Sequence, residues 1–190
     1  MKVKTKLSIL MLLLMLPVTA LFGIEAQVTS VTGTAEYRLG SAGGWQEIEA
    51  GMELPVSAQV VTSFRSSLRL EINRTEVTLG PLSRVTISDL GEENSALDAG
   101  FELPYGRLRA NVKTDTGESA DFRVRSPIST AAVRGTTFTF DGFELAVESG
   151  DVSFRNNTGQ SHSVRAGLRS RTYAYEPIVS VEETLLEEIE

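Results

Sequence analysis

Apolar and polar residues alternate with a period of two over most of the chain, from residue 28 to about residue 175. The clearest runs are residues 68–72, 108–112, 137–141 and 144–148, in which every second side chain is apolar. Each run predicts a β-strand with one buried face and one solvent-exposed face. Alternation of this kind favours antiparallel sheets over a parallel sheet that is covered on both faces.

Turns that contain glycine separate these runs. Asp141-Gly142 predicts the clearest hairpin, and residues 156–159 predict the next. We count roughly twelve short strands, at a spacing typical of sandwiches and barrels. The predicted fold class is all-β, with two packed, mainly antiparallel sheets in a sandwich or flattened β-roll. Residues 91–100 are polar and acidic, so an exposed loop is expected there. A crossover helix is not expected, which excludes a βαβ architecture.

The N-terminus predicts a signal peptide over residues 1–26. Three lysines lie within its first six residues, an apolar run covers residues 7–16, and small residues follow near Ala20, Gly23 and Ala26. We therefore expect a periplasmic or extracellular protein. The alternative is an uncleaved anchor, because residues 7–24 are just long enough to span a bilayer. Membrane association is expected only in that case.

The β domain is predicted to cover residues 27–175, and an acidic tail follows over residues 176–190. Leu185, Leu186 and Ile189 would share one face of a short helix, so the tail is expected either to form a C-terminal helix that docks or to stay loose.

The composition excludes several classes of function. The chain has no cysteine, so a lipoprotein anchor, disulfides, cysteine zinc sites and thiol nucleophiles are all excluded. The formal net charge of the whole chain is −7. Three lysines lie in the predicted leader, so its removal leaves a domain that is more acidic than the whole chain. A domain this acidic repels phosphate backbones, so nucleic acid is not an expected partner.

One segment is more specific than the rest. Residues 129–140 predict a strand, a glycine turn and a second strand, with one arginine at the turn. The order of residues resembles the core motif of the FecR domain, which is carried here by Val133, Arg134, Gly135, Thr136 and Phe138. The resemblance extends over roughly three-quarters of the chain, through weaker elements at Gly33, Trp45, Gly51, Ser126-Pro127, Gly150-Asp151 and Gly167.

The resemblance implies an extracytoplasmic β domain. Regulators of this family carry a cytoplasmic segment that holds a sigma factor, followed by a membrane span. Here the domain is expected to follow the leader directly, so the sigma-factor role is not expected to transfer. We interpret the motif residues as structural. Arg134 is expected to pair with a carboxylate or cap backbone carbonyls, and Gly135 is expected to allow a bulge or a close strand approach.

Candidate chemistry is sparse. His162 is the single histidine and is expected to be exposed, without a catalytic or metal-binding role. The carboxylates near Glu92 and Asp98 lack the spacing of a calcium loop. Trp45 or Tyr105 could stack on a sugar, although a core or rim anchor is the favoured interpretation for Trp45. No catalytic residue, metal site or cofactor is predicted.

The predicted function is a non-enzymatic binding or scaffold module of the bacterial cell envelope. It would display loops or a sheet edge to an envelope protein or a polysaccharide. Two alternatives remain at this point: an envelope component of a FecR-type transmembrane signalling system, and a carbohydrate-binding module. A glycosidase would need two carboxylates across a cleft, and the sequence does not indicate such a pair.

Overall fold

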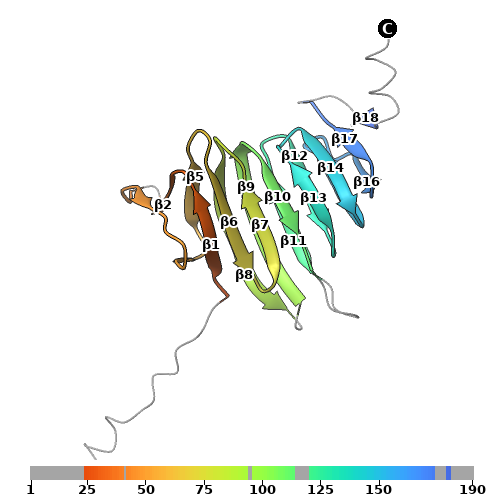
Figure 1. Ribbon diagram of the computed structural model, residues 1–190. Coiled ribbons are helices and arrows are strands. Elements are labelled where there is room, and N and C mark those ends of the chain that lie inside the picture. The colour runs from red at the N-terminus through yellow and green to blue at the C-terminus, as the bar shows by residue number, and fades with distance from the viewer. Residues whose placement is uncertain (1–23, 41, 94–95, 114–119, 174–178, 181–190) are drawn as a thin grey trace, which may run out of the picture.

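The protein folds as an elongated two-layer β-sandwich (Figure 1). The computed structural model describes residues 24–40, 42–93, 96–113, 120–173 and 179–180. Within these ranges the chain forms eighteen strands and no helix. The prediction of an all-β fold with two mainly antiparallel sheets is confirmed.

Each sheet has nine strands in the described part of the chain. In spatial order, sheet A contains β18 (Val179–Ser180), β17 (Arg169–Arg171), β14 (Glu144–Ser149), β13 (Thr137–Phe140), β10 (Leu108–Asn111), β7 (Thr75–Leu79), β6 (Ser67–Ile72), β1 (Ala26–Thr32) and β4 (Glu53–Leu54). Sheet B contains β16 (Ser161–Arg165), β15 (Asp151–Asn156), β12 (Ser129–Val133), β11 (Asp121–Arg125), β9 (Ala96–Tyr105), β8 (Arg84–Glu93), β5 (Ala58–Thr62), β2 (Ala35–Leu39) and β3 (Gln46–Glu47).

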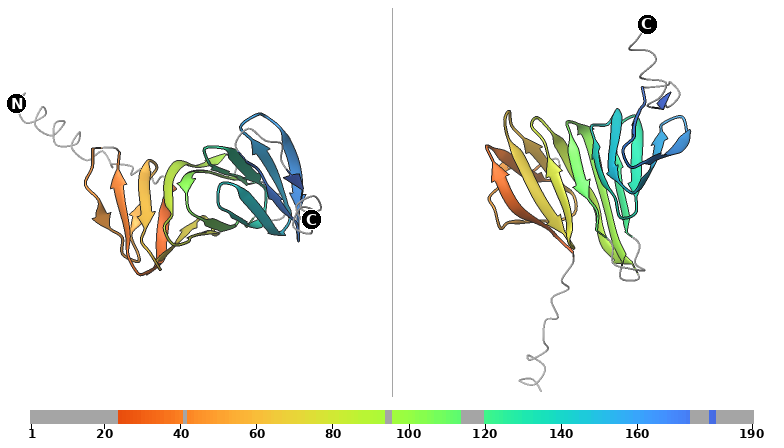
Figure 2. Two further views of the ribbon diagram at one scale, coloured as in Figure 1. Left: turned by 90° about the horizontal axis from the view of Figure 1, so that it is seen from above. Right: turned by 45° about the vertical axis from the view of Figure 1, so that its right-hand side comes forward.

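The chain builds the sandwich from one end to the other. After β5 it crosses to sheet A for β6 and β7, returns to sheet B for β8 and β9, and continues to alternate between the layers. Figures 1 and 2 show the result, with the N-terminal strands at one end of the sandwich and the C-terminal strands at the other. Strand pairing in the described residues is antiparallel except between β9 and β11. Some neighbours are consecutive along the chain, such as β6 and β7, whereas others are about 30 to 40 residues apart, such as β1 and β6.

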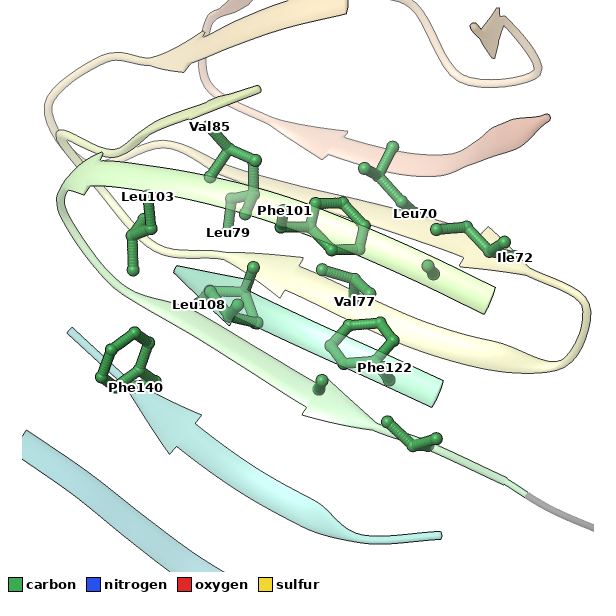
Figure 3. Packing of buried hydrophobic residues seen from close by; sticks show 14 of the residues in the cluster. Leu70, Ile72, Val77, Leu79, Val85, Phe101, Leu103, Leu108, Phe122 and Phe140 are labelled. Atoms are coloured by element: carbon green, nitrogen blue, oxygen red, sulfur yellow. The ribbon is translucent and has the colours of Figure 1, made fainter. Parts of the chain in front are cut away.

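The core lies between the two sheets and is aliphatic and aromatic. Figure 3 shows Phe101 and Phe122 of sheet B packed among side chains of sheet A such as Val77 and Leu108. The ring of Phe122 lies 5.3 Å from that of Phe101 and 6.1 Å from that of Phe138, measured between centroids. The alternating runs of the sequence supply this core, since their apolar positions are buried. Burial of these residues is the main stabilising contribution in a chain without disulfides.

Small polar residues occupy the corners where the chain crosses between the sheets. Ser83 lies in the crossing from β7 to β8 and is almost fully buried. Its hydroxyl accepts a hydrogen bond from the Arg107 amide (2.9 Å), and its own amide donates to the Thr62 hydroxyl (2.9 Å). Gly106 packs directly on Ser83, with φ at +100°. Three successive crossings are thus joined at one corner.

Both predicted hairpins are confirmed. Residues 141–143 connect β13 and β14, and residues 157–160 connect β15 and β16. The number of strands is higher than predicted, because four strands have only two or three residues. Runs that short carry no readable alternation.

The prediction of a loop over residues 91–100 is wrong. Gly91 pairs with Asp98, and Glu92 pairs with Leu97, so this segment forms the ends of β8 and β9 in a long hairpin. Leu97 and Ala99 are buried, which gives the arm an apolar face despite its acidic sequence. In the predicted tail, Val179 and Ser180 form a strand that pairs with β17. The predicted helical residues 182–190 and most of the predicted leader lie outside the described residues.

Candidate functional site

The residues of the sequence motif form a crossing between the sheets. Val133 ends β12, Arg134 to Thr136 make the crossing, and Phe138 lies in β13. The Thr136 hydroxyl is buried and lies 3.1 Å from the Asp151 carbonyl and 3.2 Å from the Arg134 carbonyl, to which it donates. The Val112 amide donates to the Thr136 carbonyl (2.9 Å). The crossing therefore holds three separate parts of the chain together.

Arg134 differs from the expectation for the motif. Its side chain is exposed, and among the described residues its guanidinium makes no hydrogen bond or ion pair. Gly135 has φ at +61° and its carbonyl lies close to Gly150, which agrees with a close approach of two crossings. The geometry assigns packing to the buried members of the motif and leaves Arg134 at the surface.

Replacing Thr136 by valine is expected to lower the free energy of unfolding by about 1–2 kcal/mol, because the buried hydroxyl and its hydrogen bonds to the Arg134 and Asp151 carbonyls are lost. Arg134→Ala is expected to change it by less than about 0.5 kcal/mol, since the side chain is exposed. Urea unfolding of the two variants measures the difference. An equal loss in both would show that Arg134 also stabilises the crossing.

Large apolar side chains gather along one edge of the sandwich, at the strand ends toward which β1 points in Figure 1. We call this surface the apolar rim. In the described part of the chain eight large apolar side chains are exposed, and five lie here with exposed fractions between 44% and 69%: Phe64, Leu82, Tyr105, Phe143 and Tyr173. Four come from different connecting segments and Tyr105 ends β9, so the rim is assembled by the fold.

Backbone contacts place these loops side by side. The Leu82 amide donates to the Ser63 carbonyl, and the Gly80 amide donates to the Arg107 carbonyl. Arg107 reaches Asp141 in the next loop, with 3.9 Å between nitrogen and oxygen. The Thr172 amide then donates to the Phe143 carbonyl. These contacts place the segments that carry the rim residues next to one another along the edge.

Two residues of the rim loops have unfavourable backbone conformations. Leu82 has φ at +51° and Arg65 has φ at +56°, in the left-handed region that side chains other than glycine rarely adopt. Leu82 is also exposed, so neither burial nor backbone preference explains a leucine at this position. Such local strain is typical of functional surfaces.

A second cluster lies on the outer face of sheet B. The guanidinium carbons of Arg38 and Arg84 lie 4.6 Å and 5.5 Å from the centroid of the Trp45 ring, and Arg84 lies 6.0 Å from that of Tyr105. Trp45 is half-buried and Tyr105 is exposed. Of the two anchor positions expected for Trp45, core or rim, the structure excludes the core, because the ring is only half-buried and arginines of the outer face lie over it.

His162 is half-buried, not exposed as expected. Its Nε2 lies 2.9 Å from the Ser170 hydroxyl, and its ring packs edge-on against Phe154. Burial lowers the pKa of His162 below its ordinary value. The neutral imidazole therefore suits this site, which lies between β16 and β17 at the C-terminal end of the sandwich.

Metal-binding groups do not converge in the described residues, since no cluster of three or more His, Asp or Glu side chains could hold an ion there. The same part of the chain contains no helix of the length and apolar character that a bilayer crossing requires.

On the outer face of sheet A, arginines pair with carboxylates, as in Arg109 with Glu148 (2.6 Å) and Arg171 with Glu144 (2.7 Å). The pair with Arg109 lowers the pKa of Glu148.

A family model described as FecR protein matches residues 58–162. The match covers more than half of the chain. The chain belongs to the FecR family. The matched region runs from β5 to β16 and includes the motif crossing, Arg84 and every residue of the apolar rim except Tyr173.

Solved structures support the same fold. Two crystal structures of a putative anti-sigma factor from Parabacteroides distasonis superpose with TM-scores of 0.52 and 0.51, at 15% and 16% identity. Each match covers 64% of this chain and 58% of the other, so the FecR domain described here spans somewhat more than half of that protein. No curated protein matches the sequence.

Sequence reasoning did not find the apolar rim. A signal was present, because Leu82 follows Gly80-Pro81, Tyr105 precedes Gly106 and Phe143 follows Asp141-Gly142. Large apolar residues within turns have no place in a core, and this points to a surface role. That the loops would be adjacent could not be known without the order of the strands.

Proposed function

We propose that this FecR domain is a non-catalytic binding module that acts outside the cytoplasm and binds a protein partner at the apolar rim. The rim itself carries the proposal: five exposed side chains from five segments form one apolar line on a protein whose other apolar side chains are mostly buried. Contiguous exposed apolar surface of this kind is typical of interaction sites.

The charges beside the rim indicate what the partner looks like. Arg65 and Arg107 flank it, Arg84 lies against Tyr105, and Asp141 is the carboxylate that accompanies them. The rim is therefore positive, whereas the chain as a whole is acidic. We expect a partner segment with apolar anchors and neighbouring Asp or Glu residues, because complementary charge favours encounter and fixes register.

Placement outside the cytoplasm rests on the predicted leader. The start of the fold refines that prediction, because Ala26 is fully buried and pairs with Leu54. A mature protein that keeps this pairing would be cleaved N-terminal to Ala26. Mass spectrometry of the secreted protein would locate the cleavage point.

A signalling role is the second candidate. The similarity to the anti-sigma factor of Parabacteroides distasonis supports it only at the level of the shared fold. A partner captured at the rim would separate the two candidates, since signalling requires that this partner continue across the inner membrane.

The test uses a photo-crosslinker placed at position 82 in producing cells, with position 39 on the opposite edge as a control. Leu39 is comparably exposed. The expected result is a crosslink at position 82 alone, to a segment of the partner that combines apolar and acidic residues. Crosslinks of equal yield at both positions, or a purely basic partner segment, would contradict the proposal.

The captured partner is then tested with purified variants. Phe64→Ser combined with Leu82→Gly is expected to weaken binding at least about tenfold, since buried apolar anchors dominate such interfaces. Leu82→Gly also relieves the positive φ, so the fold should retain its stability to within about 1 kcal/mol. Leu39→Ser with Val56→Ser on the opposite edge is the matched control and should bind normally.

A further inference from the structure

Two arginines on the outer face of sheet B are stacked on the one tryptophan of the chain. Arg38 in β2 lies opposite Gln59 of β5, and Arg84 in β8 lies opposite Val61 of the same strand. Trp45 precedes β3, and both guanidinium groups lie within 5.5 Å of its ring centroid. Stacking holds the planes of both groups in place.

Neither arginine has a carboxylate partner among the described residues. The Nε of Arg38 donates to the Gln59 side chain (2.9 Å), and the Nε of Arg84 is buried without a hydrogen bond. Most other arginines of the described chain do pair with carboxylates: Arg69, Arg107, Arg109, Arg123, Arg125, Arg169 and Arg171. Other arginines without a carboxylate partner, such as Arg134 and Arg155, are exposed. Arg38 and Arg84 differ from them because the Trp45 ring holds both in place with their terminal N–H groups free of carboxylates.

Stacked guanidinium groups present their N–H edges as forks that match a carboxylate. The exposed Tyr105 ring adjoins Arg84 and offers a flat apolar surface on which the C–H face of a sugar ring can pack. Together these groups fit a sugar that carries its own carboxylate. We propose that Arg38, Trp45, Arg84 and Tyr105 form a binding site for uronic acid residues of an acidic polysaccharide.

The tyrosine ring favours a uronate over a free anion such as phosphate. Inorganic phosphate can pair with the two arginines, but it has no sugar ring to pack on Tyr105. Glu36 of β2 lies directly opposite Glu47 of β3, close to the cluster along the same strands, so the excess of positive charge at the site is small. We therefore expect tight binding to need the ring as well as the carboxylate.

This site is separate from the proposed function. It lies on the face of sheet B, whereas the protein partner is expected on the line of loops. Tyr105 and the adjoining Arg84 belong to both surfaces, whereas Phe64 and Leu82 belong to the rim alone and Arg38 and Trp45 to the sugar site alone. Loss of one binding activity without the other is therefore measurable.

Trp45 provides the readout, because intrinsic tryptophan fluorescence reports on this site alone. Titration of the purified protein with oligogalacturonate is expected to change the emission in a saturable way. The fully methyl-esterified oligomer keeps the sugar rings and removes the charge, so it is expected to give no saturable change. Inorganic phosphate is expected not to compete.

Arg38→Gln and Arg84→Gln are each expected to weaken oligogalacturonate binding at least about tenfold, as is usual for a charge-assisted hydrogen bond. Arg155→Gln is the matched control, because Arg155 is an exposed arginine of sheet B without a carboxylate partner among the described residues and lies several strands away. Circular dichroism confirms that the variants are folded.

Four outcomes would overturn the assignment: no saturable change with the unmodified protein, equal binding of the methyl ester, displacement by phosphate, or an equal loss in Arg155→Gln. The first outcome would show that oligogalacturonate does not bind, and the second that its charge is not needed. The third would show that a free anion is enough, and the fourth that the binding site lies elsewhere.

Discussion

Replacing Gly106 by alanine is expected to lower the free energy of unfolding by about 3 kcal/mol or more. Two causes act together. The backbone at Gly106 has φ at +100°, which L-residues rarely adopt, and this alone costs about 1–3 kcal/mol. The added methyl group would also overlap the Cα, Cβ and hydroxyl of Ser83. Ser83 cannot move away without breaking its hydrogen bonds to Arg107 and Thr62.

Gly159→Ala separates the two causes. Gly159 has a similar φ of +89°, but no neighbouring atom lies within 4 Å of the position of the new methyl group. We expect a loss of about 1 kcal/mol from backbone strain alone. Urea unfolding followed by circular dichroism measures both variants. Equal losses would mean that the contact with Ser83 adds nothing.

Phe122→Ala is expected to cost about 3–5 kcal/mol, which is the range for removing a fully buried phenylalanine. Phe122 is inaccessible to solvent and packs between the rings of Phe101 and Phe138, which belong to opposite sheets. Removal of the ring leaves a cavity between the two sheets. The sheets are closely packed and cannot move together enough to close it. Thermal unfolding measures the loss.

Phe143→Ala provides the comparison for this core substitution. Phe143 lies on the apolar rim and is 56% exposed. Its removal is expected to change the stability by less than about 0.5 kcal/mol. A large loss in Phe143→Ala would show that the rim contributes to folding, which would weaken its assignment as a binding surface.

The fold class could be predicted from the sequence because the alternation in each run indicates a β-strand and shows which of its side chains face the core. The alternation predicts that Leu68, Leu70 and Ile72 share a buried face, and all three are inaccessible to solvent. The runs around Phe138 and Leu145 behave in the same way. A period of two is a local property, so it needs no knowledge of the partners of a strand.

The arm formed by β8 and β9 could not be predicted for the same reason. Around residues 91–98 the side chains are mostly polar, and only the pairing of the two backbones makes the segment a hairpin. Backbone hydrogen bonds carry no sequence signal of their own. The two-residue strands β3 and β4 are likewise defined by their neighbours alone.

The surfaces were harder to predict than the core, because they depend on which strands are adjacent. Trp45 and Arg84 are almost forty positions apart, and they meet because β2, β5 and β8 lie next to one another. Sequence reasoning could name Trp45 as a sugar-binding candidate, but not the arginines that cover it. The buried Thr136 was part of the resemblance, whereas its hydrogen bonds came from the structure.

The order in which the strands are added along the sandwich has a consequence for how the molecule is made. Each new hairpin docks on strands that were synthesised shortly before it, so a chain that emerges from a narrow channel with its N-terminus first can complete one layer of structure after another. The N-terminal strands can pair with one another before the C-terminal strands have been synthesised. Such progressive assembly suits a polypeptide that must reach its native state without cysteine cross-links.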